Sequence, residues 1–177
     1  MTPLYRKSYA EINLTYLKEN LAWIRSQFPK DTFICPMVKA NGYGHGDVII
    51  AKCLESESID YLGVCLIEEA LWLRQAGIKS NILVFRGFDK QGAEEIVNRG
   101  FIPVVSQWDH LEYLTQVNQG KAILIHIKFD TGMNRLGFPV SEAAKLDKYL
   151  WQNKNFRVKG ILTHLHSGED GLDPNGK

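Results

Sequence analysis

Apolar residues recur along this chain in two alternating patterns, one typical of helices and one typical of buried strands. Near the start, Leu14, Leu17, Leu21, Ile24 and Phe28 lie three or four residues apart. This spacing places them on one side of an amphipathic helix. We expect that helix to pack its apolar side against a sheet.

Six short apolar runs are predicted to be strands. They are rich in β-branched residues and are bounded by turn residues, as expected for strands covered on both faces. In the first run, Pro36 would remove one donor from the ladder of hydrogen bonds. The predicted strands are residues 33–38, 61–65, 81–85, 101–105, 122–128 and 158–163.

Helical stretches separate these strands, and several have recognisable ends. Glycine is favoured just after a helix, serine at its N-cap, and proline in its first turn. The predicted helices begin at Asp47, run from Ile67 to Gly77, stop at Gly100, run from an N-cap at Ser106 to Gly120, and begin near Pro139.

Strands and helices that alternate with short connections predict an α/β fold with a parallel sheet, either doubly wound or closed as a (β/α)8 TIM-type barrel. A complete barrel takes roughly 250 residues. On the barrel interpretation, residues 1–177 form a single domain, an incomplete barrel of about six strands, and there is no second domain. Residues 170–177 are a turn-rich tail where such a barrel would enter its next helix.

Composition narrows the classes of partner. The chain is 45% hydrophobic and 23% charged, as in an ordinary globular domain, and its net charge of +1 creates no field that would attract nucleic acid or a membrane. No signal peptide or membrane span is expected. Cys35, Cys53 and Cys65 lack the spacing of metal ligands, and we expect buried thiols in a reducing cytoplasm. A small molecule is the expected partner.

The sharpest chemical signal is the segment 37–46, MVKANGYGHG, in which Lys39 ends a predicted strand and three glycines follow. Active sites of parallel α/β folds lie at this end of the sheet. A lysine amine that is partly desolvated there can attack a carbonyl carbon, and glycines let backbone amides approach a phosphate. The alternative is a solvated lysine before a flexible turn.

Residues 38–46 resemble the cofactor-binding signature of the alanine racemase family, whose members are fold-type III pyridoxal-phosphate enzymes. The resemblance implies that Lys39 bonds covalently to pyridoxal phosphate and that Tyr43 hydrogen-bonds its phosphate. Family members more often have alanine where this chain has Gly42, which should only loosen the loop. The resemblance extends over nearly the whole chain, through Arg6 with residues 10–14, and through residues 61–64, 68–78 and 103–105.

A second block, residues 125–138 with the sequence IHIKFDTGMNRLGF, is similar to another conserved segment of the family. There the arginine matching Arg135 contacts the phenolic oxygen of the cofactor and the substrate carboxylate, a task that suits a guanidinium fork. In many members the lysine matching Lys128 is carbamylated, which requires a neutral amine and therefore a lowered pKa. The alternative makes Lys128, Asp130 and Arg135 a surface charge cluster.

The third block, residues 163–167 with the sequence THLHS, is similar to the family's segment beside the cofactor ring. His164 is the matching position and is expected to join the hydrogen-bond network of the pocket. His166 has no counterpart, and no third ligand suggests a metal site. Among the carboxylates, Glu68, Glu69, Glu94 and Glu95 are interpreted as solvated helix faces.

The resemblance implies the interconversion of L-alanine and D-alanine, which supplies D-alanine for peptidoglycan, in a cytoplasmic homodimer. Lys39 would handle the proton on one face of the substrate. In the family a tyrosine from the C-terminal β domain of the partner subunit serves the other face, and no residue here matches it. We therefore expect these 177 residues alone to be inactive or nearly so.

Several alternatives stay open. They are a racemase of serine or of many amino acids, a decarboxylase of basic amino acids, a non-catalytic pyridoxal-phosphate carrier, and an inactive fragment. A fragment would leave barrel edges unpaired and would tend to self-associate.

Overall fold

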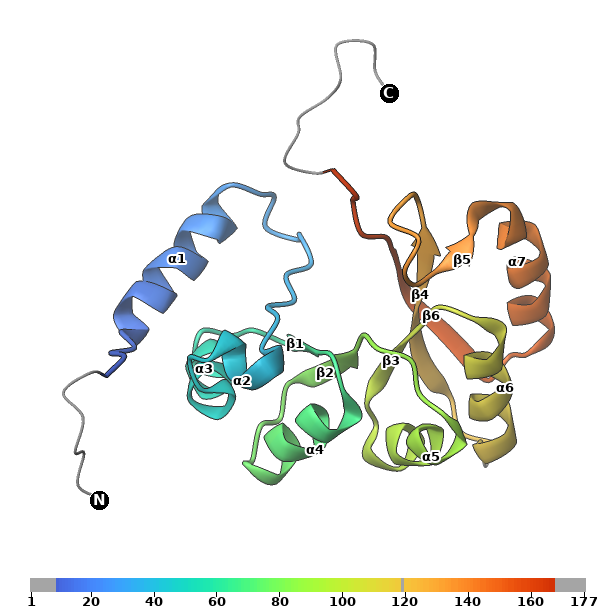
Figure 1. The fold of residues 1–177 in the computed structure, drawn as a ribbon, viewed down its shortest axis with the longest axis horizontal. Helices are drawn as coiled ribbons and strands as arrows, with labels where there is room; N and C mark the ends of the chain where they lie inside the picture. The colour runs from blue at the N-terminus through green and yellow to red at the C-terminus, as the bar shows by residue number, and fades with distance from the viewer. Residues whose placement is uncertain (1–8, 119, 168–177) are drawn as a thin grey trace, which may run out of the picture.

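The sheet is built from parallel strands that follow one another in nearly the order of the chain (Figure 1). The computed structural model describes residues 9–118 and 120–167. Neighbouring strands run in the order β1, β2, β3, β4 and β6, and the short β5 also pairs with β4. The bounds are β1 Tyr61–Val64, β2 Asn81–Val84, β3 Ile102–Val105, β4 Ile123–Asp130, β5 Phe138–Pro139 and β6 Phe156–Leu162.

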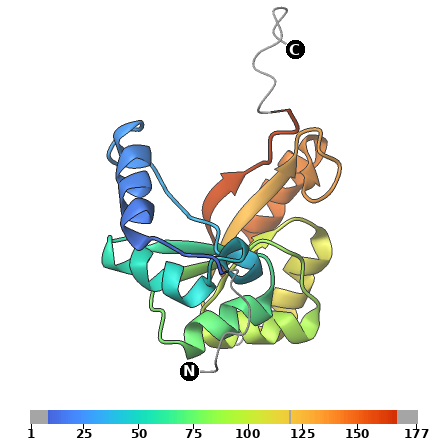
Figure 2. The same cartoon turned by 60° about the vertical axis from the view of Figure 1, so that its left-hand side comes forward.

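Helices connect successive strands, which gives the βα alternation predicted from the sequence. Figures 1 and 2 show that α4 to α7 cover one side of the curved sheet. The predicted α/β class with a parallel sheet of six strands is confirmed. The helices are α1 Leu14–Ser26, α2 Lys39–Tyr43, α3 Asp47–Ser56, α4 Ile67–Gln75, α5 Lys90–Arg99, α6 Trp108–Val117 and α7 Ala143–Gln152.

The predicted strand at residues 33–38 is much shorter than expected. Only Met37 forms a β-bridge, parallel to Gly63 of β1. The Gly63 amide donates to the Pro36 carbonyl and the Val38 amide donates to the Gly63 carbonyl, both at 2.8 Å. The ring nitrogen of Pro36 is therefore not needed as a donor, and the segment still delivers Lys39 to the edge of the sheet.

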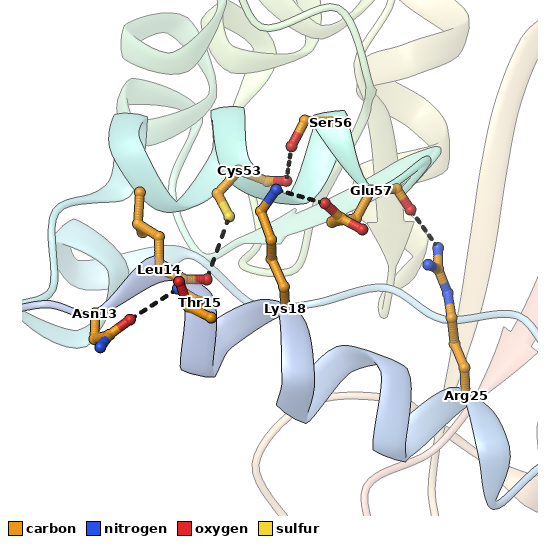
Figure 3. Close-up of polar contacts among 8 residues, drawn as sticks. All are labelled: Asn13, Leu14, Thr15, Lys18, Arg25, Cys53, Ser56 and Glu57. Atoms are coloured by element: carbon orange, nitrogen blue, oxygen red, sulfur yellow. Dashed lines mark hydrogen bonds and ion pairs between the residues drawn. The ribbon is translucent and has the colours of Figure 1, made fainter.

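The prediction that the first helix packs against the sheet is wrong, because α1 lies across α3 instead. Figure 3 shows the contacts: the Cys53 thiol approaches the Leu14 carbonyl at 3.9 Å, Lys18 Nζ lies 2.7 Å from Glu57 Oε1, and Arg25 donates to the Glu57 carbonyl at 2.7 Å. Of the five apolar residues that predicted the helix, Leu21 alone is buried. Phe28 lies outside the helix and precedes Pro29, which disfavours helical backbone.

Helix ends were predicted with mixed success. Gly77 follows α4 and Gly100 caps α5, each with positive φ, as expected. The prediction for Ser106 is wrong: Gln107 is the N-cap of α6, which ends at Val117 rather than near Gly120, and Ser106 donates its amide to His110 Nδ1 at 3.3 Å. Pro139 also precedes its helix, because a 3-10 turn at Val140–Glu142 separates it from α7.

Alternation along the strands divides their side chains between two faces. Leu62, Ile82, Val105 and Ile127 belong to the core beneath the helices. Between them, Gly63 pairs with Leu83, and Val104 pairs with His126, on the opposite side of the sheet. We call the side that carries Gly63, Leu83, Val104, His126 and Lys128 the inner face.

The three cysteines are free, but only Cys53 is fully buried. Burial nevertheless raises the pKa of the half-buried Cys35 thiol to about 12. Arg6 and the tail at 170–177 lie outside the described residues. Among the helices of the described residues, none has the length and apolar character needed to cross a membrane.

Candidate functional site

Four of the five residues proposed from the sequence lie at the carboxyl edge of the parallel sheet. Lys39 follows the Met37 bridge, Lys128 lies near the end of β4, and Arg135 lies in the loop after β4. His164 comes two residues after the end of β6. Because the strands are parallel, these four residues lie at the same edge of the sheet, where parallel α/β proteins build their sites.

Lys39 begins a turn of left-handed backbone that the sequence did not reveal. The φ angles of Ala40, Asn41, Gly42 and Tyr43 are 51°, 55°, 59° and 54°. Left-handed backbone costs roughly 1–2 kcal/mol for each residue other than glycine, so three of these positions carry strain. The turn brings Tyr43 back toward Lys39, whose Nζ lies 5.6 Å from the centroid of the Tyr43 ring.

One hydrogen bond closes this strained turn and another joins it to α3. The Gly42 amide donates to the Val38 carbonyl at 2.9 Å, and the Asp47 amide donates to Asn41 Oδ1 at 3.1 Å. A Cβ on Gly42 would lie 3.3 Å from the Asp47 nitrogen, so this glycine also lets the turn and the helix come close. Both contacts fix the backbone on either side of Lys39 and Tyr43.

Lys128 is only 7% exposed, which argues against the alternative of a surface charge cluster. Burial, and then the positive charge of Arg135, lower the pKa of Lys128, while Asp130 opposes this shift. Burial favours the neutral amine because a buried charge loses its hydration. The positive charge of Arg135 thus acts on the Lys128 amine in the same direction as burial.

The loop that carries Arg135 is tied to the end of β4. Asp130 Oδ1 accepts the amides of Gly132 and Asn134, both at 3.0 Å, and these bonds lower the pKa of Asp130. Gly137, with φ 138°, closes the loop so tightly that a Cβ there would meet the backbone of Asp130. Arg135 is exposed, but its backbone is anchored on both sides.

A bridge of hydroxyl groups joins this loop to the segment that carries His164. Thr131 and Thr163 share a hydrogen bond of 2.8 Å between their hydroxyl oxygens, and the Thr163 hydroxyl donates to the Phe129 carbonyl at 2.9 Å. His164 itself is exposed beside this bridge. Within the described residues, no hydrogen bond connects Lys39 or Tyr43 to the group formed by Lys128, Arg135 and His164.

Sequence reasoning missed two residues at this edge. The helical pattern predicts a solvated Glu69, yet its carboxylate accepts three backbone amides, one of them from Ala40. Val105 pairs with Ile127 in the parallel register of β3 and β4. The next residue, Ser106, therefore lies beside Lys128. Its buried hydroxyl has no hydrogen-bond partner among the described residues, and it lines a hollow together with Arg135. The bond of Glu69 to Ala40 leaves no local sequence signal, because the two residues are distant in the chain, and the position of Ser106 beside Lys128 depends on strand register.

The donor set fits a phosphorylated aldehyde such as pyridoxal phosphate. Lys39 offers an amine for a carbonyl carbon, Tyr43 a hydroxyl for phosphate, and Arg135 a guanidinium for an anionic oxygen. Within the described ranges, no group of three His, Cys, Asp or Glu side chains is placed so that it could hold a metal ion.

Comparison with known protein families matches residues 12–175 to the model described as alanine racemase, N-terminal domain. Among curated relatives, the alanine racemase of Methylacidiphilum infernorum is 34% identical over 177 residues, which cover 99% of this chain and 46% of that protein. The alanine racemase of Fusobacterium nucleatum is 37% identical over 165 residues, 93% of this chain and 45% of that protein.

Solved structures agree with these relatives. An alanine racemase of Clostridium difficile 630 superposes with a TM-score of 0.83 and 31% identity over 93% of this chain and 44% of its own. The alanine racemase of Bacillus anthracis with bound L-Ala-P gives a TM-score of 0.84 and 28% identity over 96% of this chain and 45% of its own. The present chain thus spans less than half the length of the relatives it matches, and its six-stranded parallel sheet corresponds to their N-terminal barrel portion.

Proposed function

The chain belongs to the alanine racemase family, and we propose that it forms the pyridoxal-phosphate-binding part of an enzyme that interconverts L-alanine and D-alanine. The observation that carries this proposal is the gathering of Lys39, Lys128, Arg135 and His164 at the carboxyl edge of one parallel sheet. Together with the family match, it favours a cofactor site over a set of unrelated surface charges.

In this proposal Lys39 holds the cofactor covalently through Nζ, Tyr43 donates to its phosphate, and Arg135 donates to its phenolic oxygen and to the substrate carboxylate. When bound, pyridoxal phosphate supplies an electron sink for the charge left on the α-carbon after proton removal. Lys39 Nζ would take or return the α-proton on one face of the substrate. His164 contributes to the hydrogen bonds around the cofactor ring.

We further propose that Lys128 is carbamylated and then orients Arg135. The reaction joins the neutral amine of Lys128 to carbon dioxide with loss of one proton, and it needs no other reagent. The burial of Lys128 supports this role, since both burial and the Arg135 charge lower its pKa and so favour the neutral amine. A carboxylate on Lys128 would in turn attract the Arg135 guanidinium.

At the level of the whole protein, we propose a cytoplasmic homodimer that supplies D-alanine for peptidoglycan. Residues 1–177 would contribute one domain of it, the pyridoxal-phosphate-binding barrel portion. The acid or base on the second face of the substrate has no candidate among the residues assigned above. Alanine is preferred over serine as the substrate because the relatives that match are named alanine racemases.

Titration of the purified chain with pyridoxal phosphate tests the site. We expect an absorbance change that saturates, and after borohydride reduction a pyridoxyl group on Lys39 by peptide mapping. Lys39→Ala should abolish the adduct, whereas Lys52→Ala, which replaces an exposed lysine of α3, should not. An adduct spread over surface lysines would contradict the assignment of Lys39. Alanine and serine offered in turn to the loaded protein would then separate the two substrates.

A further inference from the structure

The carboxylate of Glu69 joins two segments that are distant in sequence. Glu69 lies in the first turn of α4. Its Oε1 accepts the Ala40 amide at 2.7 Å, and its Oε2 accepts the amides of Cys65 and Leu66 at 2.7 and 2.9 Å. The bonds to Cys65 and Leu66 cap the helix and are local. The bond to Ala40 reaches the residue that directly follows Lys39.

The Ala40 amide needs this partner because of where it lies in the turn. In a helical turn the first amides have no carbonyl partner within the turn. Here Gly42 donates to Val38 and Gly44 donates to Ala40, but the Ala40 amide itself has no backbone acceptor among the described residues. Ala40 is also the first of the four residues with left-handed backbone. Glu69 therefore satisfies the amide at which the strained conformation begins.

Fixing the Ala40 amide also fixes Lys39. The amide belongs to the peptide plane that joins the two residues, so its orientation sets the backbone angle ψ of Lys39 and the direction in which the lysine side chain leaves the backbone. Hydrogen bonds to a charged acceptor are stronger than those to a neutral one. Glu69 Oε2 is bound to the connection between β1 and α4, so Glu69 holds the turn at a fixed position relative to the sheet.

We propose that Glu69 is a positioning residue that holds Lys39 in place by binding the Ala40 amide. The inference rests on the proposed function only in taking Lys39 as the amine that bonds to pyridoxal phosphate. Glu69 acts through the backbone of Ala40 and touches neither substrate nor cofactor.

The chain offers a matched control one residue away. Glu68 lies in the same first turn of α4, is exposed, and makes no hydrogen bond within the described part of the chain. Glu69→Gln keeps the length of the side chain but removes the charge and one of the two acceptor oxygens. Glu68→Gln makes the same chemical change without touching the turn. Glu69→Asp keeps the charge but withdraws it by one methylene.

Two measurements test the proposal on the 177-residue chain, after thermal unfolding has shown which variants are folded. The first is hydrogen exchange of the Ala40 amide by NMR, for which we expect at least tenfold faster exchange in Glu69→Gln and no change in Glu68→Gln. The second is the rate at which pyridoxal phosphate attaches to Lys39, measured by borohydride trapping and peptide mapping across pH. It should fall at least tenfold in Glu69→Gln, with more of the adduct on other lysines.

A purely structural role would lower the unfolding temperature of Glu69→Gln but leave the preference for Lys39 unchanged, and that result would overturn the proposal. Unchanged exchange of Ala40 in a folded variant would do the same. If Glu69→Gln does not fold, Glu69→Asp and the protection of Ala40 in the unaltered chain decide the question, since an unprotected amide there contradicts the contact. Absence of any adduct on Lys39 in the unaltered chain would instead refute the proposed function, while hydrogen exchange would still test the role of Glu69.

Discussion

Lys128 shows how burial gives a residue chemistry that its type alone does not. It lies on the inner face with little exposure and, among the described residues, makes no ion pair within 4 Å. A lysine without a partner normally stays in water, because burying an unpaired charge is costly. A neutral amine avoids that cost, and so the same burial that destabilises the charged form favours the neutral amine that the proposed carbamylation would need.

His110 offers a residue-scale prediction about pH. It is 1% exposed, it stacks on Phe88 at 4.4 Å between ring centroids, and Nδ1 accepts the Ser106 amide. Burial lowers its pKa to about 4, against the weaker influence of Asp109. In the unfolded chain the His110 imidazole takes up a proton near pH 6.5, whereas in the folded chain it does so only near pH 4. The contribution of the neutral His110 to the free energy of unfolding is therefore complete above pH 6.5 and is lost as pH falls toward 4. We expect the free energy of unfolding to fall by about 3 kcal/mol through this group as pH falls from 6.5 to 4.

His110→Asn tests this expectation, because the Asn oxygen can accept the Ser106 amide but does not titrate. Urea unfolding between pH 4.5 and 7 should show a smaller loss of stability on acidification in His110→Asn than in the unaltered chain. His126, whose pKa burial also lowers, should leave part of the slope. The exposed His166→Asn is the control and should change nothing. Identical slopes for His110→Asn and the unaltered chain would show that His110 is not the titrating group.

At the residue scale, the sequence predicted most residues of the candidate site but not the residues that lie behind them. The motifs pointed to Lys39, Arg135 and His164, and the structure brings these residues to one edge of the sheet. The roles of Glu69 and Ser106 were mistaken, because local pattern gave one as a solvated carboxylate and the other as a helix cap. A contact over 29 residues, such as that of Glu69 with Ala40, leaves no periodic trace in the sequence.

At the scale of the elements, hydrophobic pattern predicted β1 to β4 and β6 closely, since alternation and glycine stops are local signals. It failed where partners outside the segment decide the conformation. The segment at 33–38 is an extended chain with one bridge, and the left-handed turn after it depends on hydrogen bonds to α3 and α4. The packing of α1 on α3 likewise rests on contacts that no helical pattern specifies.

The loop between β4 and β5 gives a prediction at this scale. Gly137→Ala would force a Cβ against the backbone of Phe129 and Asp130, which cannot move aside without breaking the end of β4. We expect a loss of more than about 2 kcal/mol in the free energy of unfolding. Gly132→Ala is the matched control: its φ of 133° is equally unfavourable, but a Cβ there would have no atom within 4 Å. It should cost only the backbone strain, roughly 1 kcal/mol.

Urea unfolding of the two variants separates the steric clash of the added Cβ at position 137 from the backbone strain that both variants share. The Gly137 variant should also retain less pyridoxal phosphate on Lys39 at equal protein concentration, since the loop positions Arg135. Equal losses of stability in the two variants would mean that β4 adjusts freely, and that the loop does not hold Arg135 as tightly as its hydrogen bonds suggest.

At the scale of the molecule, the described sheet is covered unevenly. Ile125 and Ile127 of β4 are buried beneath the helices, yet their register partners on β6, Val158 and Ile161, are 42% and 70% exposed. Within the described ranges, β6 pairs with β4 alone, so one edge of β6 has no strand partner. An uncovered apolar strand with a free edge is a template for association.

We therefore expect the 177-residue chain to self-associate through β6, and Ile161→Lys to suppress this. A lysine on an edge strand blocks pairing by its charge and hydration. Because Ile161 is largely exposed, the substitution should change the free energy of unfolding by less than about 0.5 kcal/mol. Trp151→Lys, which replaces an equally exposed apolar residue of α7, is the control and should leave association unchanged. Sedimentation velocity over a range of concentrations measures the effect. If Ile161→Lys and the unaltered chain associate to the same extent, while Trp151→Lys is monomeric, the surface that associates lies on α7 and not on β6.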